Sequence, residues 1–443
     1  MRLKRRELKA ILESMEMAER YKPFQVAKRK VMEKYGLLGS RADRLATALL
    51  YKMYRLQGVL DDVVAEVLGV EVRRLPAYLR QSYRLAAYLA LYDTGRDSRL
   101  AEQLLDYAAR VAAARFSDSE AERVEKLYRV LRGGKWSPSR DVEVELRLLL
   151  PPVIVKRLFK LLGSMDEVER FASAVNNPNP IYGLRVNTLK TDMEEVLKAL
   201  EEIGVEAWPS RRVSGHIRYR GGLPYERFQP LREGKVVPQD ESSAAAAPLL
   251  SPRPGARVAD LCAAPGGKTT HIAELQRNRG NIIALELYGD RISRLVDLAR
   301  RTGTYASINP VIGDALRAST LVRRADSVLL DPPCSSTGAI ARHPEARWRL
   351  TERVLRQLAA RQYRMLKEAV ALLPSGGRLL YTVCSVMPEE GEYLISRALE
   401  ELPVSLVPLH GPYDASPLLP GTMRAWPHRH GTTGFFYALL ERR

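Results

Sequence analysis

The stretch VADLCAAPGGKTTH, at Val258–His271, decides the fold. A short apolar run ends there in small residues, a proline and two glycines, and a helical pattern follows. This order predicts a buried parallel strand, a tight turn and the start of a helix. Because Gly266 and Gly267 lack a Cβ, a ligand can approach the backbone beside the unpaired N–H groups of the helix N-terminus.

Two kinds of nucleotide site use such a turn. A phosphate-binding P-loop requires a glycine where this chain has Cys262, although Val328–Asp331 (VLLD) resembles the Mg²⁺-holding strand of an NTPase. A Rossmann-like methyltransferase instead requires an acidic residue at the end of the next strand, where it holds ribose hydroxyls. Asn281–Leu287 (NIIALEL) is that strand, and Glu286 follows Lys268 by 18 residues. The sequence therefore favours a methyltransferase site over an NTPase.

Composition limits the class of partner. Lys and Arg outnumber Asp and Glu by 70 to 52, which gives the 443 residues a net charge of +18. Such an excess favours a polyanion, with RNA or DNA first. No apolar run approaches 18 residues, and the basic start is not followed by the apolar segment of a secretory signal. Three cysteines without zinc-ligand spacing predict a reducing, cytoplasmic setting and no metal site.

The chain divides into three predicted domains: 1–148, 149–235 and 236–443. The first has only helical patterns, and we expect Asp61 to begin a new helix as its N-cap. Arg132–Arg140 is a predicted linker. The second is a small α/β unit, in which Ser164 with Glu167, and Thr191 with Glu194, are expected to cap helices. This unit has no catalytic cluster of its own, so we expect it to present substrate.

The third domain alternates strands and helices, which predicts a mainly parallel, doubly wound α/β sheet. Its fourth strand, Asp326–Asp331, and its fifth, Arg378–Cys384, should be neighbours. Cys334 and Cys384 would then flank one crevice at the carboxyl edge of the sheet, where ligands bind in such folds. Val404–Val407 and Gly434–Glu441 are expected to close the sheet as an antiparallel pair.

The fourth strand runs into Asp331-Pro332-Pro333-Cys334, and the fifth ends in Tyr381-Thr382-Val383-Cys384-Ser385. An Asp-Pro-Pro in this position places a planar nucleobase beside a methyl donor. Enzymes that methylate exocyclic amines have an aromatic residue next, which stacks on the base. Cys334 cannot stack, but it can act as a nucleophile or as an acid–base group.

Together, DLCAAPGGKTT, DPPCSSTG and YTVCS resemble the Nop/Sun family of RNA cytosine-5 methyltransferases. Gln239–Ser243 and Gly434-Phe435-Phe436 match as well, so the resemblance covers roughly 150–443. The helical start is similar to the NusB-like RNA-binding domain of the RsmB-like branch. The resemblance implies a Rossmann-like catalytic domain behind a small RRM-like domain. Thr433, where Asp often precedes Gly-Phe-Phe, is a departure that affects either local packing or RNA contact.

The resemblance also implies residue roles. Cys384 is the expected nucleophile, Cys334 assists product release, and Asp331 holds the cytosine. Carbon 5 of cytosine is too weak a nucleophile unaided, and a thiolate that adds at carbon 6 activates it. Lys268 is expected to lower the pKa of that thiolate. The residues expected around S-adenosylmethionine are Cys262, Ala263, Ala264, Pro265, Gly266, Gly267, Lys268, Glu286, Arg291, Asp314 and Asp331.

The sequence leaves the RNA open. The NusB-like start favours ribosomal RNA, and transfer RNA is the alternative. An amino-group methyltransferase and a non-catalytic RNA-binding assembly factor are rival functions, against which the cofactor loop and the two cysteines argue. We expect a cytoplasmic monomer that binds RNA, with no membrane partner and no metal. Reaching carbon 5 also requires an unpaired or flipped base.

Overall fold

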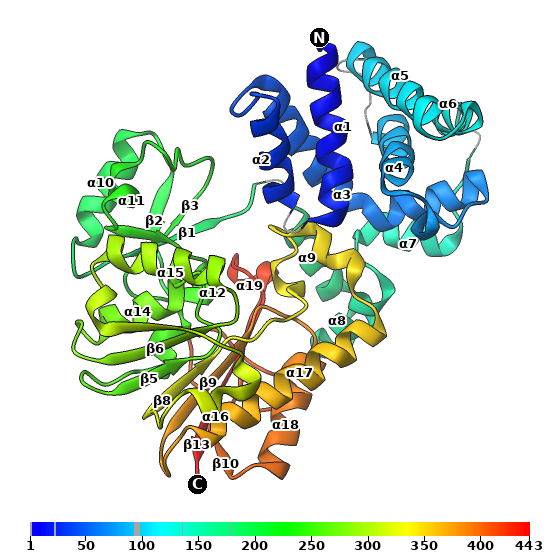
Figure 1. Ribbon diagram of the computed structural model, residues 1–443. Coiled ribbons are helices and arrows are strands. Elements are labelled where there is room, and N and C mark those ends of the chain that lie inside the picture. The colour runs from blue at the N-terminus through cyan, green and yellow to red at the C-terminus, as the bar shows by residue number, and fades with distance from the viewer. Residues whose placement is uncertain (1, 22–23, 93–97, 135, 178) are drawn as a thin grey trace. The chain divides into compact units, whose positions relative to one another are not determined.

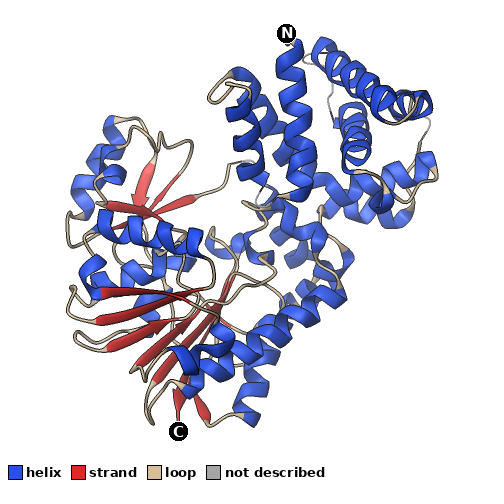
Figure 2. Ribbon diagram, in the orientation of Figure 1, coloured by secondary structure: helices blue, strands red, loops and turns tan. Residues whose placement is uncertain are grey.

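The computed structural model describes residues 2–21, 24–92, 98–134, 136–177 and 179–443. It divides into two compact units, and one of them is discontinuous in sequence. The first comprises the chain up to Pro152 together with His343–Trp348. The second comprises Val153–Arg342 and Arg349–Arg443. The secondary structure of both units is coloured in Figure 2.

The described residues of the first unit form helices joined by turns and loops, with no strand among them. Its helices are α1 (Arg5–Arg20), α2 (Phe24–Lys34), α3 (Arg41–Leu68), α4 (Ala77–Tyr92), α5 (Ser98–Arg115), α6 (Asp118–Arg132) and α7 (Arg140–Leu148). Trp348 also belongs to this unit: its Nε1 donates to the Arg55 carbonyl at 3.1 Å, and a Cβ at Gly58 would lie 2.1 Å from its ring. The predicted linker joins α6 to α7, although Lys135 within it lies outside the described residues.

The expected helix start at Asp61 is wrong, because α3 continues through it to Leu68. Asp61 does not cap a helix; its two carboxylate oxygens accept from Arg84 on α4 at 2.6 and 2.7 Å. The Arg84 side chain is only 3% exposed, so it requires a counter-charge from a neighbouring helix. The acidic residue in the middle of α3 is therefore explained by a tertiary ion pair, which the local pattern cannot reveal.

The second unit begins with helices α8 (Pro152–Leu162) and α9 (Met165–Asn176) and then forms a small sheet of order β2-β3-β1-β4. Its strands are β1 (Tyr182–Val186), β2 (Ala207–Pro209), β3 (His216–Tyr219) and β4 (Val236–Pro238), and α10 (Met193–Glu202) and α11 (Gln229–Arg232) accompany them. Leu184, Val186 and Ile217 pack in the same apolar cluster as Val196 and Leu200 of α10.

Two predicted helix caps are adjusted here. Ser164 caps α9 by accepting from the Glu167 amide, but the Glu167 carboxylate turns to Arg429, so the capping box is half formed. The cap of α10 is Asp192, which accepts from the Glu195 amide, rather than Thr191 with Glu194. The Thr191 hydroxyl instead donates to the Glu195 carboxylate at 2.6 Å.

The large sheet has nine strands in the order β11-β12-β13-β9-β8-β5-β6-β7, with β10 paired to β13. They are β5 (Arg257–Asp260), β6 (Asn281–Glu286), β7 (Ile308–Ile312), β8 (Ser327–Leu330), β9 (Arg378–Val383), β10 (Val404–Val407), β11 (Asp414–Ala415), β12 (Met423–Ala425) and β13 (Phe435–Arg442). Strands β5 to β9 are parallel, and β10 and β13 form the predicted antiparallel pair.

Helices cover both faces of this sheet (Figure 1). Helices α13 (Ala246–Leu250), α14 (Gly267–Leu275) and α15 (Gly289–Thr302) pack on one face. Helices α16 (Ala318–Leu321), α17 (Glu352–Ala371) and α18 (Glu392–Glu401) pack on the other. The short α12 (Glu241–Ala244) and α19 (Pro427–His430) lie in connections. The order of strands reverses between β5 and β8, so the crevice outside their carboxyl ends is the expected ligand site.

Candidate active site

The loop between β5 and α14 forms the floor of the site. Gly266 has a φ of +104°, and a Cβ there would lie 3.1 Å from Cγ of Leu295. A side chain at this position would be strained and would crowd α15, so the turn requires glycine. The Thr269 hydroxyl donates to the Asp260 carboxylate at 2.7 Å and ties the start of α14 to the end of β5.

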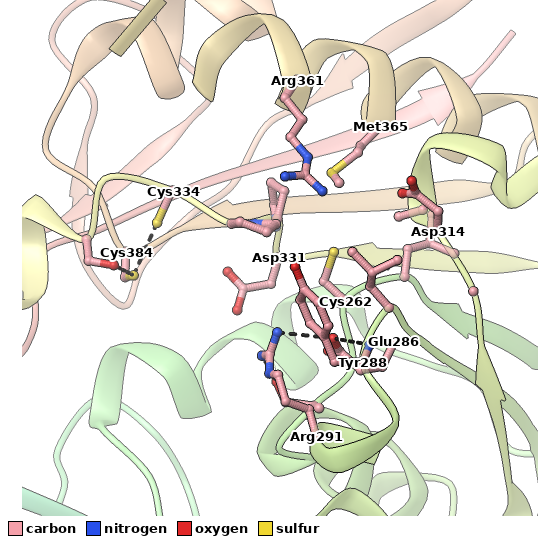
Figure 3. A pocket seen from close by; sticks show the side chains of 18 residues that line it. Cys262, Glu286, Tyr288, Arg291, Asp314, Asp331, Cys334, Arg361, Met365 and Cys384 are labelled. Atoms are coloured by element: carbon pink, nitrogen blue, oxygen red, sulfur yellow. Dashed lines mark hydrogen bonds and ion pairs between the residues drawn. The ribbon is translucent and has the colours of Figure 1, made fainter. Parts of the chain in front are cut away.

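A cavity of about 440 Å³ opens above this loop, and Figure 3 shows its side chains. Its lining comes from the carboxyl ends of β5, β6, β7, β8 and β9 and from α15 and α17. Eight of the residues expected from the sequence line it: Cys262, Ala264, Glu286, Arg291, Asp314, Asp331, Cys334 and Cys384. The other five expected residues lie behind the lining: Ala263, Pro265, Gly266, Gly267 and Lys268. The first four complete the turn between β5 and α14, and the Lys268 side chain contacts Asp331.

Glu286 has the environment expected of a ribose ligand. It ends β6 and is 3% exposed, and its Oε1 lies 3.1 Å from Nη1 of Arg291. Arg291 also donates to the carbonyl of Ala264 at 2.8 Å. Arg291 therefore holds both the carboxylate and the loop after β5, and its side chain is 42% exposed.

Lys268, which lies behind the cavity lining, forms an ion pair with Asp331, which lines the cavity. The ammonium nitrogen is 2.6 Å from Oδ2 of Asp331. Burial alone would lower the pKa of Lys268, but the Asp331 charge and hydrogen bond raise it above its ordinary value. Lys268 therefore carries a positive charge, and it holds the Asp331 side chain directly after the end of β8.

The two cysteine sulfurs lie side by side. Strands β8 and β9 pair in parallel, and Sγ of Cys334 is 3.3 Å from Sγ of Cys384 (Figure 3). Both sulfurs therefore lie at the same part of the cavity, which Asp331 also lines. The strand order alone predicted that both cysteines would reach one crevice.

The pKa values of the two thiols are shifted in opposite directions. A hydrogen bond from Cys334 lowers the pKa of Cys384, with help from the Ser336 hydroxyl and the Lys268 charge. The same bond to Cys384 raises the pKa of Cys334 well above its ordinary value, and burial adds to the rise. The pair therefore favours a Cys384 thiolate that accepts from a Cys334 thiol. The expected contribution of Lys268 exists, but Cys334 is the larger cause.

The third cysteine behaves differently. Burial raises the pKa of Cys262, and the nearby Asp260, Asp331 and Glu286 charges raise it further. A thiol that stays protonated is a poor nucleophile. Cys262 is therefore a small apolar wall residue of the cavity.

A buried carboxylate fixes both cysteine loops. Glu390, which is fully buried, accepts from the Ser335 amide at 2.8 Å and from the Ser385 hydroxyl at 2.5 Å. It also accepts from the Ser335 hydroxyl and from the Gln362 amide. Ser335 and Ser385 directly follow the two cysteines, so this one side chain sets the separation of the two thiols. We call Glu390, Ser335 and Ser385 the carboxylate clamp.

Sequence reasoning missed several residues of the site. Arg361 and Met365 of α17 line the cavity, as does Tyr288 at the end of β6. The spacing of four places Arg361 and Met365 on one face of their helix, but nothing in the residue types shows which face meets the cavity. Glu390 looks like its neighbour Glu389 in the sequence, and only its burial in the structure distinguishes the two.

The described residues contain no group of three or more His, Cys, Asp or Glu side chains arranged to hold a metal ion. No helix in the described part of the chain is long and apolar enough to cross a membrane.

Comparisons with known proteins place the chain among methyltransferases. A family model described as 16S rRNA methyltransferase RsmB/F matches residues 247–441, and one for the ferredoxin-like domain of RsmF/B-like methyltransferases matches residues 150–224. Ribosomal RNA small subunit methyltransferase B of Citrobacter koseri is 33% identical over 296 residues, which is 67% of each chain.

Two further matches span most or all of the chain. A Synechocystis protein named probable ribosomal RNA small subunit methyltransferase B is 30% identical over 410 residues, 90% of this chain and 91% of its own. The crystal structure of PH0851 has a TM-score of 0.87 and 38% identity, and the match covers 100% of both chains.

Proposed function

The chain belongs to the RsmB/F family of rRNA methyltransferases, and from this premise we propose that it forms 5-methylcytosine in ribosomal RNA. The observation that carries the proposal is the 3.3 Å separation of Cys334 and Cys384 beside Asp331 and a cavity of cofactor size. Methylation of an exocyclic amine requires no thiolate. Two cysteine thiols beside one cytosine ring suit a mechanism in which one thiolate bonds to the ring and activates a carbon atom.

S-adenosylmethionine fits the donor set of the cavity. Cys262 and Ala264 of the loop after β5 line the cavity, and Glu286 offers an acceptor for ribose hydroxyls at the end of β6. Asp314 would take the adenine amino group, and the Cys262–Lys268 loop would hold the methionine portion. When bound, the cofactor supplies a methyl group activated by a sulfonium charge.

The protein's own residues supply the rest of the chemistry. The Cys384 thiolate adds to carbon 6 of the cytosine and forms an S–C6 bond, which leaves carbon 5 electron-rich. Asp331, held by Lys268, accepts from the amino group and aligns N3 of the ring. Once Cys384 is bonded to carbon, it is no longer negative, and the largest cause of the raised pKa of Cys334 is removed. When carbon 5 carries the methyl group, Cys334 would give its proton to solvent and, as a thiolate, would take the proton from carbon 5. The electrons of that C–H bond would form the C5–C6 double bond, and the S–C6 bond would break with Cys384 leaving as a thiolate.

The predicted domains receive roles in the same proposal. The NusB-like helices of 1–148 would bind RNA through general contacts with phosphates. The ferredoxin-like 149–235 would present the substrate, and 236–443 would carry out the transfer. We expect the protein to act as a monomer in the cytoplasm.

Product analysis tests the proposal. The purified protein, labelled S-adenosylmethionine and unmodified 16S rRNA should yield 5-methylcytidine on nucleoside mass spectrometry, and bisulfite sequencing should locate it. Label in N4-methylcytidine would overturn the mechanism. If 5-methylcytidine forms only in bulk transfer RNA, assayed in parallel, the proposed reaction stands and ribosomal RNA is ruled out as the substrate. Failure to bind the cofactor in calorimetry would favour a non-catalytic assembly factor.

A further inference from the structure

A second, smaller cavity of about 130 Å³ begins just beyond the loop of Cys334. Gly338 and Ala339 line it, two and three residues after Ser336, which lines the large cavity. The Gly338 amide donates to the carbonyl of Cys384 at 3.1 Å, and its own carbonyl accepts from Gly434 at 2.9 Å. A Cβ on Gly338 would lie 1.9 Å from the Gly434 carbonyl. Bare backbone is therefore the wall between this cavity and the nucleophile.

The lining of the smaller cavity is polar and cationic. Its described residues include Asn177, Asn179, Thr433, Arg220 and Arg342, and no carboxylate is among them. Thr433 stands where Asp often precedes Gly-Phe-Phe, so this wall of the cavity has a hydroxyl in place of a carboxylate. The cavity can therefore accept an anionic or a neutral hydrogen-bonding ligand without repulsion from its lining.

Arg342 is held in place by a buried acid. Its Nη2 lies 2.5 Å from Oδ2 of Asp240 and donates to the Ile181 carbonyl at 3.1 Å. Burial would raise the pKa of Asp240, but Arg342, Ser242 and Thr432 hold it well below its ordinary value. Asp240 is thus ionised at neutral pH and fixes the guanidinium, which also lies 5.5 Å from the centroid of the Tyr182 ring.

The cavity continues onto one face of the small sheet. Trp208 of β2 pairs with Arg218 of β3, and side chains alternate along a strand, so Trp208, Arg218 and Arg220 lie on the same face. The opposite face, with Ile217 and Tyr219, packs in the apolar cluster. Nη2 of Arg218 donates to the carbonyl of Gly431 at 2.8 Å, and Gly431 lines the smaller cavity. The sheet face and the cavity therefore meet at Arg218.

A hollow of about 400 Å³ extends this face, lined by Trp208, Pro209, Arg211, Arg212 and Arg218. We call Trp208, Arg211, Arg212, Arg218, Arg220 and Arg342 the arginine track. Arg211 is exposed and makes no ion pair or hydrogen bond with the described residues. Arg220 pairs with Glu206, but both side chains are more than half exposed (52% and 64%), so the pair contributes little and can be exchanged for a phosphate.

We propose that the arginine track binds the single-stranded RNA that adjoins the target cytosine. The neighbouring nucleotide enters the cavity lined by Gly338 and Thr433, and the following phosphates lie along Arg220 and Arg211. The guanidinium of Arg220 lies 5.4 Å from the centroid of the Trp208 ring, and a base can extend this stack. This inference rests on the proposed function, because it assigns the path of the RNA away from Cys384.

Binding and catalysis can be measured separately. The variants are Arg211→Glu, Arg220→Ala and Trp208→Ala, each in the full chain. The matched control is Arg323→Glu, an exposed arginine that precedes β8 and so lies at the opposite edge of the large sheet from the cysteines. The binding probe is fluorescein-labelled twelve-residue oligocytidine, read by anisotropy from 50 to 300 mM salt. The catalytic readout is KM for 16S rRNA.

We expect each of the three variants to raise Kd and KM for RNA about tenfold, while the KM for S-adenosylmethionine does not change. The slope of log Kd against log salt should fall by about 0.7 for each phosphate-contacting arginine removed. Arg323→Glu should match the wild type in all these measurements. Because Arg211 is exposed and unpaired, its substitution tests the track without risk to folding.

RNA shortened on one side of the target fixes the direction of the track. Shortening on the side that occupies the track should abolish the difference between Trp208→Ala and the wild type, and shortening on the other side should preserve it. Wild-type affinity and salt slope in Arg211→Glu and Arg220→Ala would overturn the track while the proposed function stands. A wild-type protein that binds oligocytidine through the track but methylates no rRNA would overturn the proposed function alone.

Discussion

The loops that carry Cys334 and Cys384 share one design, yet their thiols differ in protonation. The two cysteines follow neighbouring parallel strands, β8 and β9, each precedes a serine, and both serines bond to Glu390. The difference arises from the other neighbours. Cys384 is hydrogen-bonded to Cys334 and Ser336, and both bonds lower its pKa, whereas the charges of Cys384, Glu390 and Asp331 raise the pKa of Cys334. A shared clamp sets the distance, and unequal surroundings decide which sulfur reacts.

The strongest test of this difference removes the reactive sulfur. Cys384→Ala should lower kcat for RNA methylation by at least about 10⁴-fold, because the enzyme loses its nucleophile. Transfer of labelled methyl groups to 16S rRNA measures it. S-adenosylmethionine binding in calorimetry serves as the check that the variant is folded. Turnover near that of the wild type would show that Cys384 is not the nucleophile.

Breaking the clamp should have a smaller effect. Glu390→Gln replaces an acceptor for both serine hydroxyls with a donor inside a fully buried site. We expect kcat to fall about 100-fold as the thiols lose alignment, and the free energy of unfolding to fall by about 2–4 kcal/mol. Denaturant unfolding and steady-state kinetics measure the two effects. Glu400→Gln, at an exposed position on the neighbouring α18, is the control. Equal behaviour of the two variants would rule out the clamp.

The protonation difference can be read from alkylation. The pKa of Cys384 is lowered and those of Cys334 and Cys262 are raised, so Cys384 has the largest thiolate fraction of the three, and iodoacetamide should label it first at pH 7. The rate at which Cys384 is alkylated should rise with pH, and the midpoint of that rise should lie at a lower pH than for an ordinary cysteine. In Cys334→Ala the donor is lost, so the midpoint should move to higher pH. Peptide mass spectrometry follows each site, and an unchanged midpoint would remove Cys334 as the cause.

The smallest expected effect concerns Ser336, whose hydroxyl is 3.7 Å from Sγ of Cys384. Its φ of +55° suits glycine, so Ser336→Gly removes the hydroxyl without adding strain. One weak hydrogen bond corresponds to about a threefold slower alkylation of Cys384 at pH 7. A rate equal to that of the wild type would assign the whole effect to Cys334.

The parallel core of the fold could be read from the sequence because its signals are local. The loop at Cys262–Lys268 sits between a buried strand and a helix, and the strand order then places Cys334 beside Cys384. The paired short strands β11 and β12, of two and three residues, have too few residues for an alternation to be visible.

The supporting residues of the site could not be read in this way. Asp61 looked like a helix cap because its partner, Arg84, is 23 residues away and on another helix. Glu390 and Gln362 contact each other, and so support the site, only when α17 and the loop after β9 pack together. Such residues depend on tertiary contacts between ordinary polar side chains, and no local pattern marks them.

The most direct test of the central claim is the reaction of the Cys334→Ala variant with 16S rRNA and S-adenosylmethionine. Without Cys334 to complete release, the RNA should remain bonded to Cys384. A slow band should appear on a denaturing gel, and after nuclease digestion mass spectrometry should find methylated cytidine on the Cys384 peptide. Full turnover without an adduct, or an adduct on Cys262, would contradict the account.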